Sequence, residues 1–557
     1  MTNQVDIESL LDEIEQKQGK KQKVRRDGKG RREPKLVFAA EPWSFEHLAI
    51  LVAVTVLAGV LRLYHIGQWS LWIDEVHTLR DAVLNPVERF WADSGTARYP
   101  IGFLILRWLE PFLPSASEGS YRLPFAFFGI CSVPLLATVA RRVVGAGPAL
   151  LAALILAVSP WHLFWSQSVR FYSVELFLVL LAAACFFAGV ESGRRRWLLG
   201  SLLFAGLAGL THPSAALVVV GFVAFLVVMR FGPFEWPERL DSRAILTFAL
   251  PLIVGGLVLL TSVGEAFAQF RSTKPEDETL FHLINTSVWF LRVPVIVAGI
   301  GGAYLLWQRS RRLALFLVSM IAVPSLGIAA ASLMARASAQ YLFFTLPFWC
   351  VLAAFAAFEI VSRVEFDRGR TFAVRAVVFG FLLLDPVAQD HLYYHYRHGD
   401  RPKWRIAANY IQEKSSPDDM FAATNEPSME WYLNPVSPLK EVPNLDGENR
   451  KTIGLIADWT IQKLPELRNA AKKSGRRLWL ITTPPTLAEA DREKKWEVWI
   501  RKHCRQALSL PNWLGPRDMT VQVWCYDPAA EAALESDADT DAKPAADESS
   551  KDRGKRS

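Results

Sequence analysis

The chain has 557 residues, of which 51% are hydrophobic and 21% are charged, and its formal net charge is +7. The mean hydropathy of +0.17 conceals an uneven distribution, because nearly uncharged runs such as 51–60, 176–189, 215–229 and 250–262 alternate with polar stretches. This pattern excludes a soluble enzyme, a disordered chain and, with only five cysteines, a small disulfide scaffold. We expect a polytopic α-helical membrane protein without a nucleic-acid partner.

Eleven apolar segments are candidates for crossing a bilayer, which takes roughly 20 residues. The fifth is short, and the fourth and fifth have soft boundaries. We expect the spans near 46–66, 121–140, 148–166, 171–190, 197–212, 214–230, 244–263, 288–307, 313–333, 340–361 and 372–389.

Positive charges predict the sidedness of these spans, because lysine and arginine gather on cytoplasmic loops. The N-terminal tail, residues 1–45, is strongly basic between 17 and 35, and alternate connections near 141, 195, 240, 311 and 366 are rich in arginine. The first apolar run is expected to act as an uncleaved anchor, with the N-terminus cytoplasmic. An odd number of spans then places everything after about 390 on the extracytoplasmic side of an inner (cell) membrane.

The first outer loop, residues 67–120, is too long for a simple connector. Its apolar stretch 99–111 is shorter than a span and is bounded by prolines and charge. We expect a helix that lies on the outer interface. The membrane body is therefore assigned to residues 46–390.

Residues 391–527 alternate helical and strand patterns, which predicts a small α/β domain. Helices are expected at 403–412, 459–473 and 486–503, and strands at 420–424, 478–482 and 520–525. Residues 528–557 are polar and expected to be disordered. Cys504 and Cys525 could form a disulfide in an oxidising compartment or could be buried thiols.

The segment Ser70–Arg80 just after the first span is the strongest candidate for chemistry. It places Asp74, Glu75 and His77 among apolar and aromatic residues at the outer interface. On a helix Asp74 and Glu75 diverge by about 100°, whereas Asp74 and His77 share a face. A carboxylate beside cations suits activation of a nucleophile near a lipid phosphate. An interfacial helix with an ordinary solvated acidic pair would show the same spacing.

The order of these motifs resembles the GT-C fold glycosyltransferases of family 39, which include protein O-mannosyltransferases and aminoarabinose transferases. Asp74-Glu-Val-His77 resembles the acidic pair that the family carries in its first outer loop. Further matches follow in the expected order, at Arg98-Tyr-Pro-Ile-Gly102, Tyr121-Arg-Leu-Pro124, Ser159-Pro-Trp161, Ser166-Gln-Ser-Val-Arg-Phe-Tyr172 and Leu210-Thr-His-Pro213. The late Arg-Tyr of the family reads Gln340-Tyr341 here, and Arg336 lies one turn away.

The resemblance implies transfer of a sugar from a polyprenyl-phosphate donor to an acceptor at the outer face, with inversion and with Asp74 as general base. Glu75 would complete the acidic pair or hold the Asp74 helix in place. Groups for the donor phosphate would be His77, Arg98, Arg170, His212, Arg336 and Tyr341. Glu175 lies about a turn inside a span, where an acid is costly, and Arg170 or Arg122 is its expected partner.

Two other functions fit a polytopic chain. A transporter or flippase for a lipid-linked substrate is the main alternative, although we find no internal repeat and the polar groups cluster outside. An inactive scaffold whose outer domain binds a partner is the second. A divalent metal is possible but unsupported by the sequence. His391, His395 and His398 have no cysteine or carboxylate spacing beside them except Asp390 and Asp400, and an interfacial anchor is the favoured interpretation. The sugar and the acceptor stay open.

Overall fold

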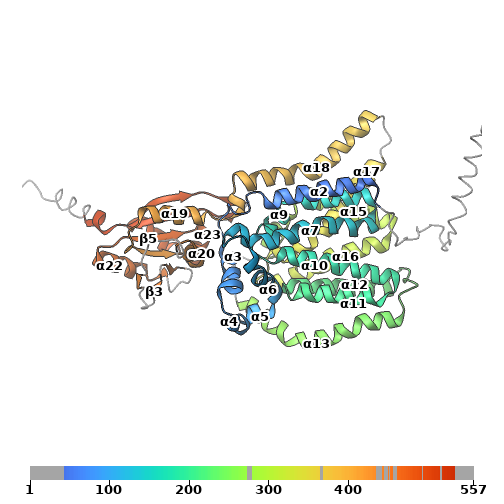
Figure 1. Ribbon diagram of the computed structural model, residues 1–557, viewed down its shortest axis with the longest axis horizontal. Helices are drawn as coiled ribbons and strands as arrows, with labels where there is room; N and C mark the ends of the chain where they lie inside the picture. The colour runs from blue at the N-terminus through green and yellow to red at the C-terminus, as the bar shows by residue number, and fades with distance from the viewer. Residues whose placement is uncertain are drawn as a thin grey trace, which may run out of the picture.

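A computed structural model describes residues 43–272, 279–363, 368–433, 461–491, 493–514 and 517–532, together with short pieces between 442 and 455. A bundle of long helices forms the body of the molecule, and a small sheet domain projects from one end of it (Figure 1). The predictions for the basic tail up to residue 42 and for the polar tail after residue 532 lie outside the described residues. Residues 528–532 are helical rather than disordered, because Glu531 is held by Arg468, Lys472 and Tyr526.

Each of the eleven expected spans has a helical counterpart. Seven helical segments are long and apolar enough to cross a membrane, and two bent helix pairs raise the number to nine within the described residues. The seven contain α2 Phe45–Leu63, α7 Glu118–Val144, α10 Tyr172–Ser192, α12 Ala216–Phe231, α16 Arg311–Ser332, α17 Leu346–Ser362 and α18 Arg368–His395. The other two expected spans correspond to α11 Arg195–Gly209, which has 15 residues, and to α13 Ser242–Ser272.

The two bent pairs depart from the expected straight spans. The segment expected at 148–166 breaks into α8 Ala146–Ala157 and α9 Pro160–Ser166, which meet at 60°. Pro160 cannot continue a helix from the preceding turn, and Ser159 caps the new one instead. The segment expected at 288–307 is α15 Val293–Arg309, preceded at 90° by α14 Leu280–Leu291. The expected span at 340–361 starts with a 3-10 turn, η4 Ala339–Thr345, before α17.

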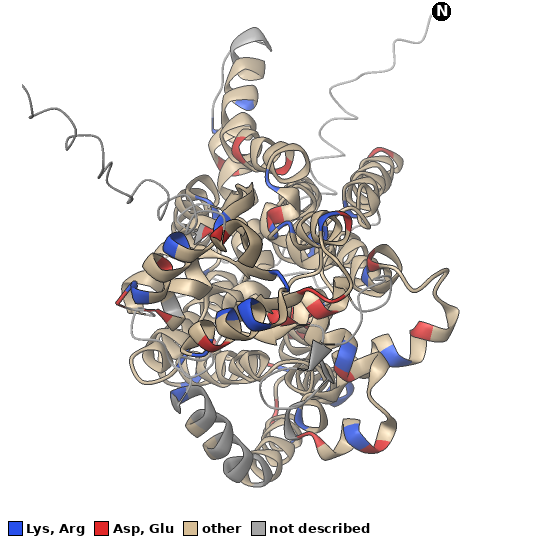
Figure 2. Cartoon of the chain, turned by 90° about the vertical axis from the view of Figure 1, so that its left-hand side faces the viewer, with Lys and Arg blue, Asp and Glu red and all other residues tan. Residues whose placement is uncertain are grey.

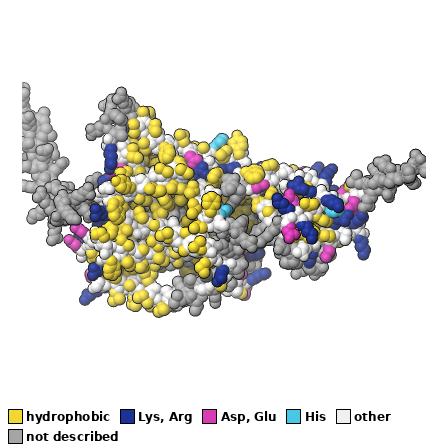
Figure 3. Space-filling model, turned by 180° about the vertical axis from the view of Figure 1, so that it is seen from behind, with side chains coloured by type: hydrophobic (Ala, Val, Ile, Leu, Met, Phe, Trp, Pro, Cys, Tyr) yellow, Lys and Arg dark blue, Asp and Glu magenta, His cyan; other side chains and the backbone are white. Residues whose placement is uncertain are grey.

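Small residues let the body helices approach closely. A Cβ at Gly302 of α15 would lie 1.9 Å from the Leu352 carbonyl oxygen of α17, and one at Gly299 would lie 2.6 Å from the Trp349 ring. Close backbone approach is how helices associate in lipid, where burial of apolar surface supplies no driving force. The face of the body seen in Figure 3 is predominantly hydrophobic, as a lipid-facing surface should be.

The first outer loop folds into short helices at the end of the body that faces the sheet domain (Figure 1). In chain order they are α3 Ile73–Leu79, the π-helical turn η1 Arg80–Leu84, α4 Val87–Ala92, α5 Ser94–Arg98, α6 Pro100–Leu109 and the 3-10 turn η2 Glu110–Phe112. The helix expected at 99–111 is confirmed as α6. It exposes Trp108 and Leu109, as expected of an interfacial helix.

The C-terminal domain contains a five-stranded sheet of order β4-β1-β5-β9-β6. Its strands are β1 Met420–Ala423, β4 Ile453–Gly454, β5 Leu478–Thr482, β6 Arg505–Leu510 and β9 Val521–Tyr526. Strands β4, β1 and β5 are parallel, β9 runs antiparallel to β5, and β6 pairs antiparallel with β9 at the edge of the sheet. The surrounding helices are α19 Trp404–Lys414, α20 Glu426–Leu433, α22 Leu464–Ser474, α23 Pro484–Ala490 and α24 Lys495–His503. Short pairs β2 Val442–Pro443 with β3 Asn449–Arg450, and β7 Trp513–Leu514 with β8 Arg517–Asp518, complete the described strands.

The three expected strands and two of the three expected helices of this domain are confirmed. The helix expected at 486–503 is instead the separate α23 and α24, divided around Asp491, whose carboxylate caps the start of α24. Strands β4 and β6 were not expected. Cys504 and Cys525 are both free thiols. Seen from the domain end, acidic and basic side chains are interspersed (Figure 2).

Candidate active site

Motifs that are far apart in the sequence meet beneath the C-terminal domain. The backbone N–H of Ile101 donates to the Leu210 carbonyl at 3.3 Å, which joins the Arg98–Gly102 motif to the Leu210–Pro213 turn. A Cβ at Gly102 would lie 2.5 Å from Cβ of Phe171, so α6 packs directly on the Ser166–Tyr172 junction. Three of the five motifs that follow the acidic pair therefore lie side by side.

Asp74 faces Arg170 across this meeting point. A terminal nitrogen of Arg170 lies 3.8 Å from Oδ2 of Asp74, and the other donates to the Thr78 hydroxyl at 3.0 Å. The Arg170 guanidinium also lies 4.5 Å from the centre of the Phe171 ring. Arg170 lies on one side of the Asp74 carboxylate. The Asp74 side chain is 32% exposed, so the carboxylate remains accessible to a substrate.

His77 lies one turn after Asp74 on the same helix and is partly buried. Burial and the charge of Arg80 lower the pKa of His77 below its usual value. The side chain is therefore neutral near pH 7, and its Nδ1 is buried without a hydrogen-bond partner in the part of the chain that the structure describes. A neutral imidazole can accept or donate one further hydrogen bond there.

Glu75 points away from Asp74 into a fully buried network. Its two carboxylate oxygens accept from Nε and a terminal nitrogen of Arg122, each at 2.9 Å, and Nε of Arg401 lies 3.3 Å away. The Val169 N–H donates to the same carboxylate at 2.8 Å. Burial opposes ionisation of Glu75, but the charges of Arg122 and Arg401 outweigh it and lower the pKa. Glu75 is inaccessible to substrate, so we assign it to positioning α3.

Arg401 and Gln167 belong to this network, and sequence reasoning did not single them out. Arg401 donates to the Gln167 carbonyl at 2.8 Å and to the Ser168 hydroxyl at 2.6 Å. Gln167 in turn accepts from the Trp69 indole at 3.0 Å and from the Tyr393 hydroxyl at 2.8 Å. Arg401 lies 326 positions from Glu75, and no local pattern indicates a contact of that range.

Glu175 is fully buried, as expected of an acid inside a span, but its predicted partners are wrong. Its Oε1 accepts from the Ser214 hydroxyl at 2.9 Å and lies 3.9 Å from Nδ1 of His212. Arg170 and Arg122 are unavailable because they are directed to Asp74 and Glu75. The Tyr341 ring lies 5.0 Å from the His212 ring, which brings Tyr341, His212 and Glu175 together on the far side of Phe171.

The two remaining candidates lie at the margins. Arg98 is partly buried at the end of α5, three residues before the Ile101–Leu210 contact. Arg336 is exposed in the connection between α16 and η4. The structure thus brings Asp74, His77, Arg170 and the Glu175–His212–Tyr341 group together, while Arg336 stays a prediction.

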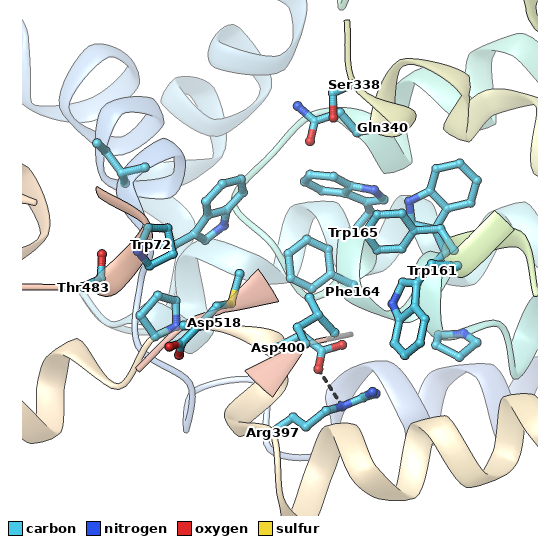
Figure 4. Close-up of a pocket in the computed structure, with 18 of the residues that line it drawn as sticks. Trp72, Trp161, Phe164, Trp165, Ser338, Gln340, Arg397, Asp400, Thr483 and Asp518 are labelled. Carbon is cyan, nitrogen blue, oxygen red and sulfur yellow. Dashed lines mark ion pairs between the residues drawn. The ribbon is translucent and has the colours of Figure 1, made fainter. Parts of the chain in front are cut away.

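A cavity of about 210 Å³ lies between the body and the C-terminal domain (Figure 4). Trp72 and Ile73, which directly precede Asp74, line it, and so do Ser338 and Gln340 beside Tyr341. None of the predicted site residues is among its lining residues. Within the described ranges, no three His, Cys, Asp or Glu side chains are grouped to hold a metal ion.

Comparisons with known proteins bear on the fold and on the activity. Residues 100–255 match the family described as dolichyl-phosphate-mannose-protein mannosyltransferase. The Bacillus subtilis (strain 168) protein YycA, provisionally named a mannosyltransferase, is 26% identical over 227 residues. That match covers 40% of this chain and 31% of YycA, so the chain spans about a third of the relative's length. Both names support a glycosyltransferase.

Solved structures share the fold over most of the chain. ArnT from Cupriavidus metallidurans in the apo state has a TM-score of 0.50 at 16% identity, covering 86% of this chain and 98% of ArnT. ArnT bound to undecaprenyl phosphate gives the same TM-score of 0.50 at 15% identity, covering 87% and 98%. The apo oligosaccharyltransferase of Archaeoglobus fulgidus has a TM-score of 0.53 at 12% identity, covering 82% and 72%. The chain is a multi-span membrane protein with the GT-C fold of membrane glycosyltransferases.

Proposed function

We propose that this GT-C protein is a glycosyltransferase that moves a sugar from a polyprenyl-phosphate donor to an acceptor at the outer face of the cell membrane. The observation that carries the proposal is the contrast between Asp74 and Glu75. Asp74 is accessible and faces a cation, whereas Glu75 is fully buried in the network that fixes α3. A carboxylate held open on a rigid support is what a catalytic base requires.

Asp74 acts as general base in this mechanism. Its carboxylate takes the proton of the acceptor's nucleophile, usually a hydroxyl, as the nucleophile attacks the anomeric carbon. The bond from that carbon to the phosphate oxygen breaks, and its electron pair leaves with the polyprenyl phosphate. Attack from the face opposite the leaving group gives inversion. Such positioned proton transfer contributes about 10²–10⁴-fold to the rate.

Arg170 stabilises the charge that develops on the leaving phosphate. Its Nε is buried without a hydrogen-bond partner in the described part of the chain, so the guanidinium has a donor left for a ligand. His77 and His212, beside it, supply neutral imidazoles, and Arg98 adds a second cation at the margin. Fixed donors aimed at developing charge are commonly the largest contribution to catalysis. The undecaprenyl phosphate bound to ArnT supports a polyprenyl carrier for this chain.

The test is transfer by membranes that contain the Asp74→Asn variant and labelled polyprenyl-phosphate sugars. We expect loss of at least about 10²-fold in transfer with normal insertion and an unchanged melting midpoint. Glu88→Gln is the matched control, because Glu88 is an exposed carboxylate on α4 of the same loop. Substantial transfer by Asp74→Asn would overturn the base assignment.

The same membranes separate the enzyme from the alternatives. Transfer of label to an acceptor identifies a glycosyltransferase. Movement of the donor to a protected leaflet without transfer would identify a flippase. If neither transfer nor movement is observed, the scaffold is the remaining alternative.

A further inference from the structure

The cavity of about 210 Å³ between the body and the C-terminal domain is separate from the residues assigned to catalysis. It begins at Trp72 and Ile73, next to Asp74 in the chain, and the Trp72 ring lies 6.2 Å from the Trp165 ring. Trp165 in turn lies 4.2 Å from Tyr172, which is two residues after Arg170. One aromatic wall therefore faces the cavity and continues toward the catalytic group.

The C-terminal domain lines the cavity with residues at the carboxyl ends of its parallel strands, the edge at which open α/β sheets usually bind ligands. Asn425 follows strand β1, and Thr483 and Thr486 follow strand β5, and all three line the cavity. Strands β1 and β5 are parallel, so their carboxyl ends lie at the same edge. Ligands of such sheets bind in the crevice outside those carboxyl ends.

Four tryptophans that line the cavity carry indole N–H groups without an acceptor. Trp72, Trp161, Trp165 and Trp404 all have a buried Nε1 with no hydrogen-bond partner in the described structure. A buried indole N–H usually finds a partner. These donors lie buried in the residues that wall the cavity, where a ligand with several oxygen acceptors could use those that turn toward it.

The charges at the cavity disfavour a phosphate as that ligand. Its two arginines are already paired: Arg292 makes two 2.7 Å contacts with Asp385, and Arg397 lies 2.9 Å from Asp400 (Figure 4). The remaining lining combines aromatic faces and neutral hydroxyl and amide groups with the carboxylate of Asp518, which would repel a phosphate. A sugar ring has one apolar C–H face and an edge of hydroxyl groups, which matches both features.

We propose that this cavity binds a sugar ring of the acceptor, so that the acceptor is a glycan or a glycolipid rather than a bare peptide. The proposal rests on the proposed function, because it assigns the second substrate to a site next to Asp74. The C-terminal domain then selects the acceptor through Asn425, Thr483 and Thr486, while the body holds the donor.

Saturation-transfer difference NMR on the full chain in detergent tests this assignment. The probes are trisaccharides of mannose, glucose, galactose, rhamnose and N-acetylglucosamine, and a blocked Ala-Ser-Thr-Ala peptide. We expect saturable binding of at least one trisaccharide and none of the peptide. Trp404→Phe, which removes the N–H donor and shortens the aromatic face, and Ser338→Phe, which fills the cavity, should each weaken binding at least about tenfold.

Trp513→Phe is the matched control, because Trp513 belongs to the same domain, is 60% exposed and does not line the cavity. Binding of the peptide alone, or of none of the probes, overturns the proposal. Loss of saccharide binding when undecaprenyl phosphate is added would assign the cavity to the donor and overturn it as well. Asp74→Asn should keep saccharide binding, so a failure of the catalytic assignment is seen in transfer and a failure of this one in binding.

Discussion

Two neighbouring carboxylates, Asp74 and Glu75, differ in environment because a helix turns their side chains apart by about 100°. Asp74 is 32% exposed beside Arg170, and Glu75 has no exposed surface and is held by Arg122 and Arg401. A buried ion pair recovers the desolvation cost only when its geometry and hydrogen bonds are complete. The Val169 N–H and both arginines complete the hydrogen bonds of the Glu75 carboxylate.

Glu75→Gln tests this network through stability. Removing the charge leaves two buried guanidinium groups without a counterion, which should cost about 3–5 kcal/mol of unfolding free energy and lower the melting midpoint. Because the folded-state pKa of Glu75 is below its ordinary value of 4.5, the stabilisation is present above about pH 4.5 and is lost as the pH falls through the folded pKa.

Melting curves between pH 3 and pH 8 measure both effects. The parent chain should lose stability below about pH 4.5 more steeply than Glu75→Gln does. Glu497→Gln removes an exposed pair with Arg501 and should change stability by less than about 1 kcal/mol. Equal effects of the two substitutions would contradict a network role for Glu75.

Arg170 is expected to act on the donor. Arg170→Ala removes the cation next to Asp74 and should lower kcat/KM for the polyprenyl-phosphate sugar about 10²-fold, with a smaller effect on acceptor KM. Arg501→Ala is the control, since the Arg501 side chain on α24 is 60% exposed and contacts Glu497. Steady-state kinetics with each substrate varied in turn separates the two effects, and an unchanged donor dependence would remove Arg170 from the phosphate site.

At the scale of elements, the turn between α18 and the C-terminal domain is held in an unfavourable backbone. His398, Gly399 and Asp400 have φ angles of +50°, +61° and +56°. The left-handed region costs a side-chain-bearing residue roughly 1–2 kcal/mol. Two contacts stabilise the turn: His398 Nε2 accepts a hydrogen bond from the Ser70 N–H at 3.1 Å, and Arg401, which follows the turn, forms an ion pair with Glu75. Burial and the nearby cations lower the pKa of His398 to about 3, which keeps it a neutral acceptor.

Gly399→Ala should destabilise this turn. A Cβ at Gly399 would lie 2.5 Å from the Trp69 ring in addition to the backbone penalty. Gly475→Ala is the control, because Gly475 has φ +67° but nothing within 4 Å of a Cβ. We expect Gly399→Ala to lower the melting midpoint clearly more than Gly475→Ala. Equal shifts would mean that only the backbone matters at residue 399.

Element types were predictable where the apolar pattern was long, and their breaks were not. The pattern predicts 148–166 and 486–503 as continuous, whereas Pro160 and the Asp491 cap divide them. Strand β4 has two residues, too few for an alternation to appear in the sequence. The positions of Asp74 and Arg170 were predictable from local motifs. The Glu175–Ser214 and Glu75–Arg401 contacts depend on packing between distant helices, for which a single sequence holds no local signal.

On the scale of the whole molecule, the outer loop and the C-terminal domain lie at the same end of the body, and α2 begins toward the other end (Figure 1). This arrangement agrees with the sidedness that the arginine-rich connections predict. If the N-terminus is cytoplasmic, Asp74, the cavity and the sheet domain all face the extracytoplasmic side. A polyprenyl-linked donor would then be used after its head group has reached the outer leaflet.

Labelling with a membrane-impermeant maleimide tests the sidedness. Val498 on α24 is 64% exposed, and Val498→Cys should be labelled in intact cells. Glu235, exposed in the connection between α12 and α13, is predicted to be cytoplasmic, so Glu235→Cys should be labelled only after permeabilisation. The parent chain, with Cys525 partly buried, sets the background. The opposite pattern would put Asp74 in the cytoplasm, and donor sugar would then have to be supplied from the inner leaflet.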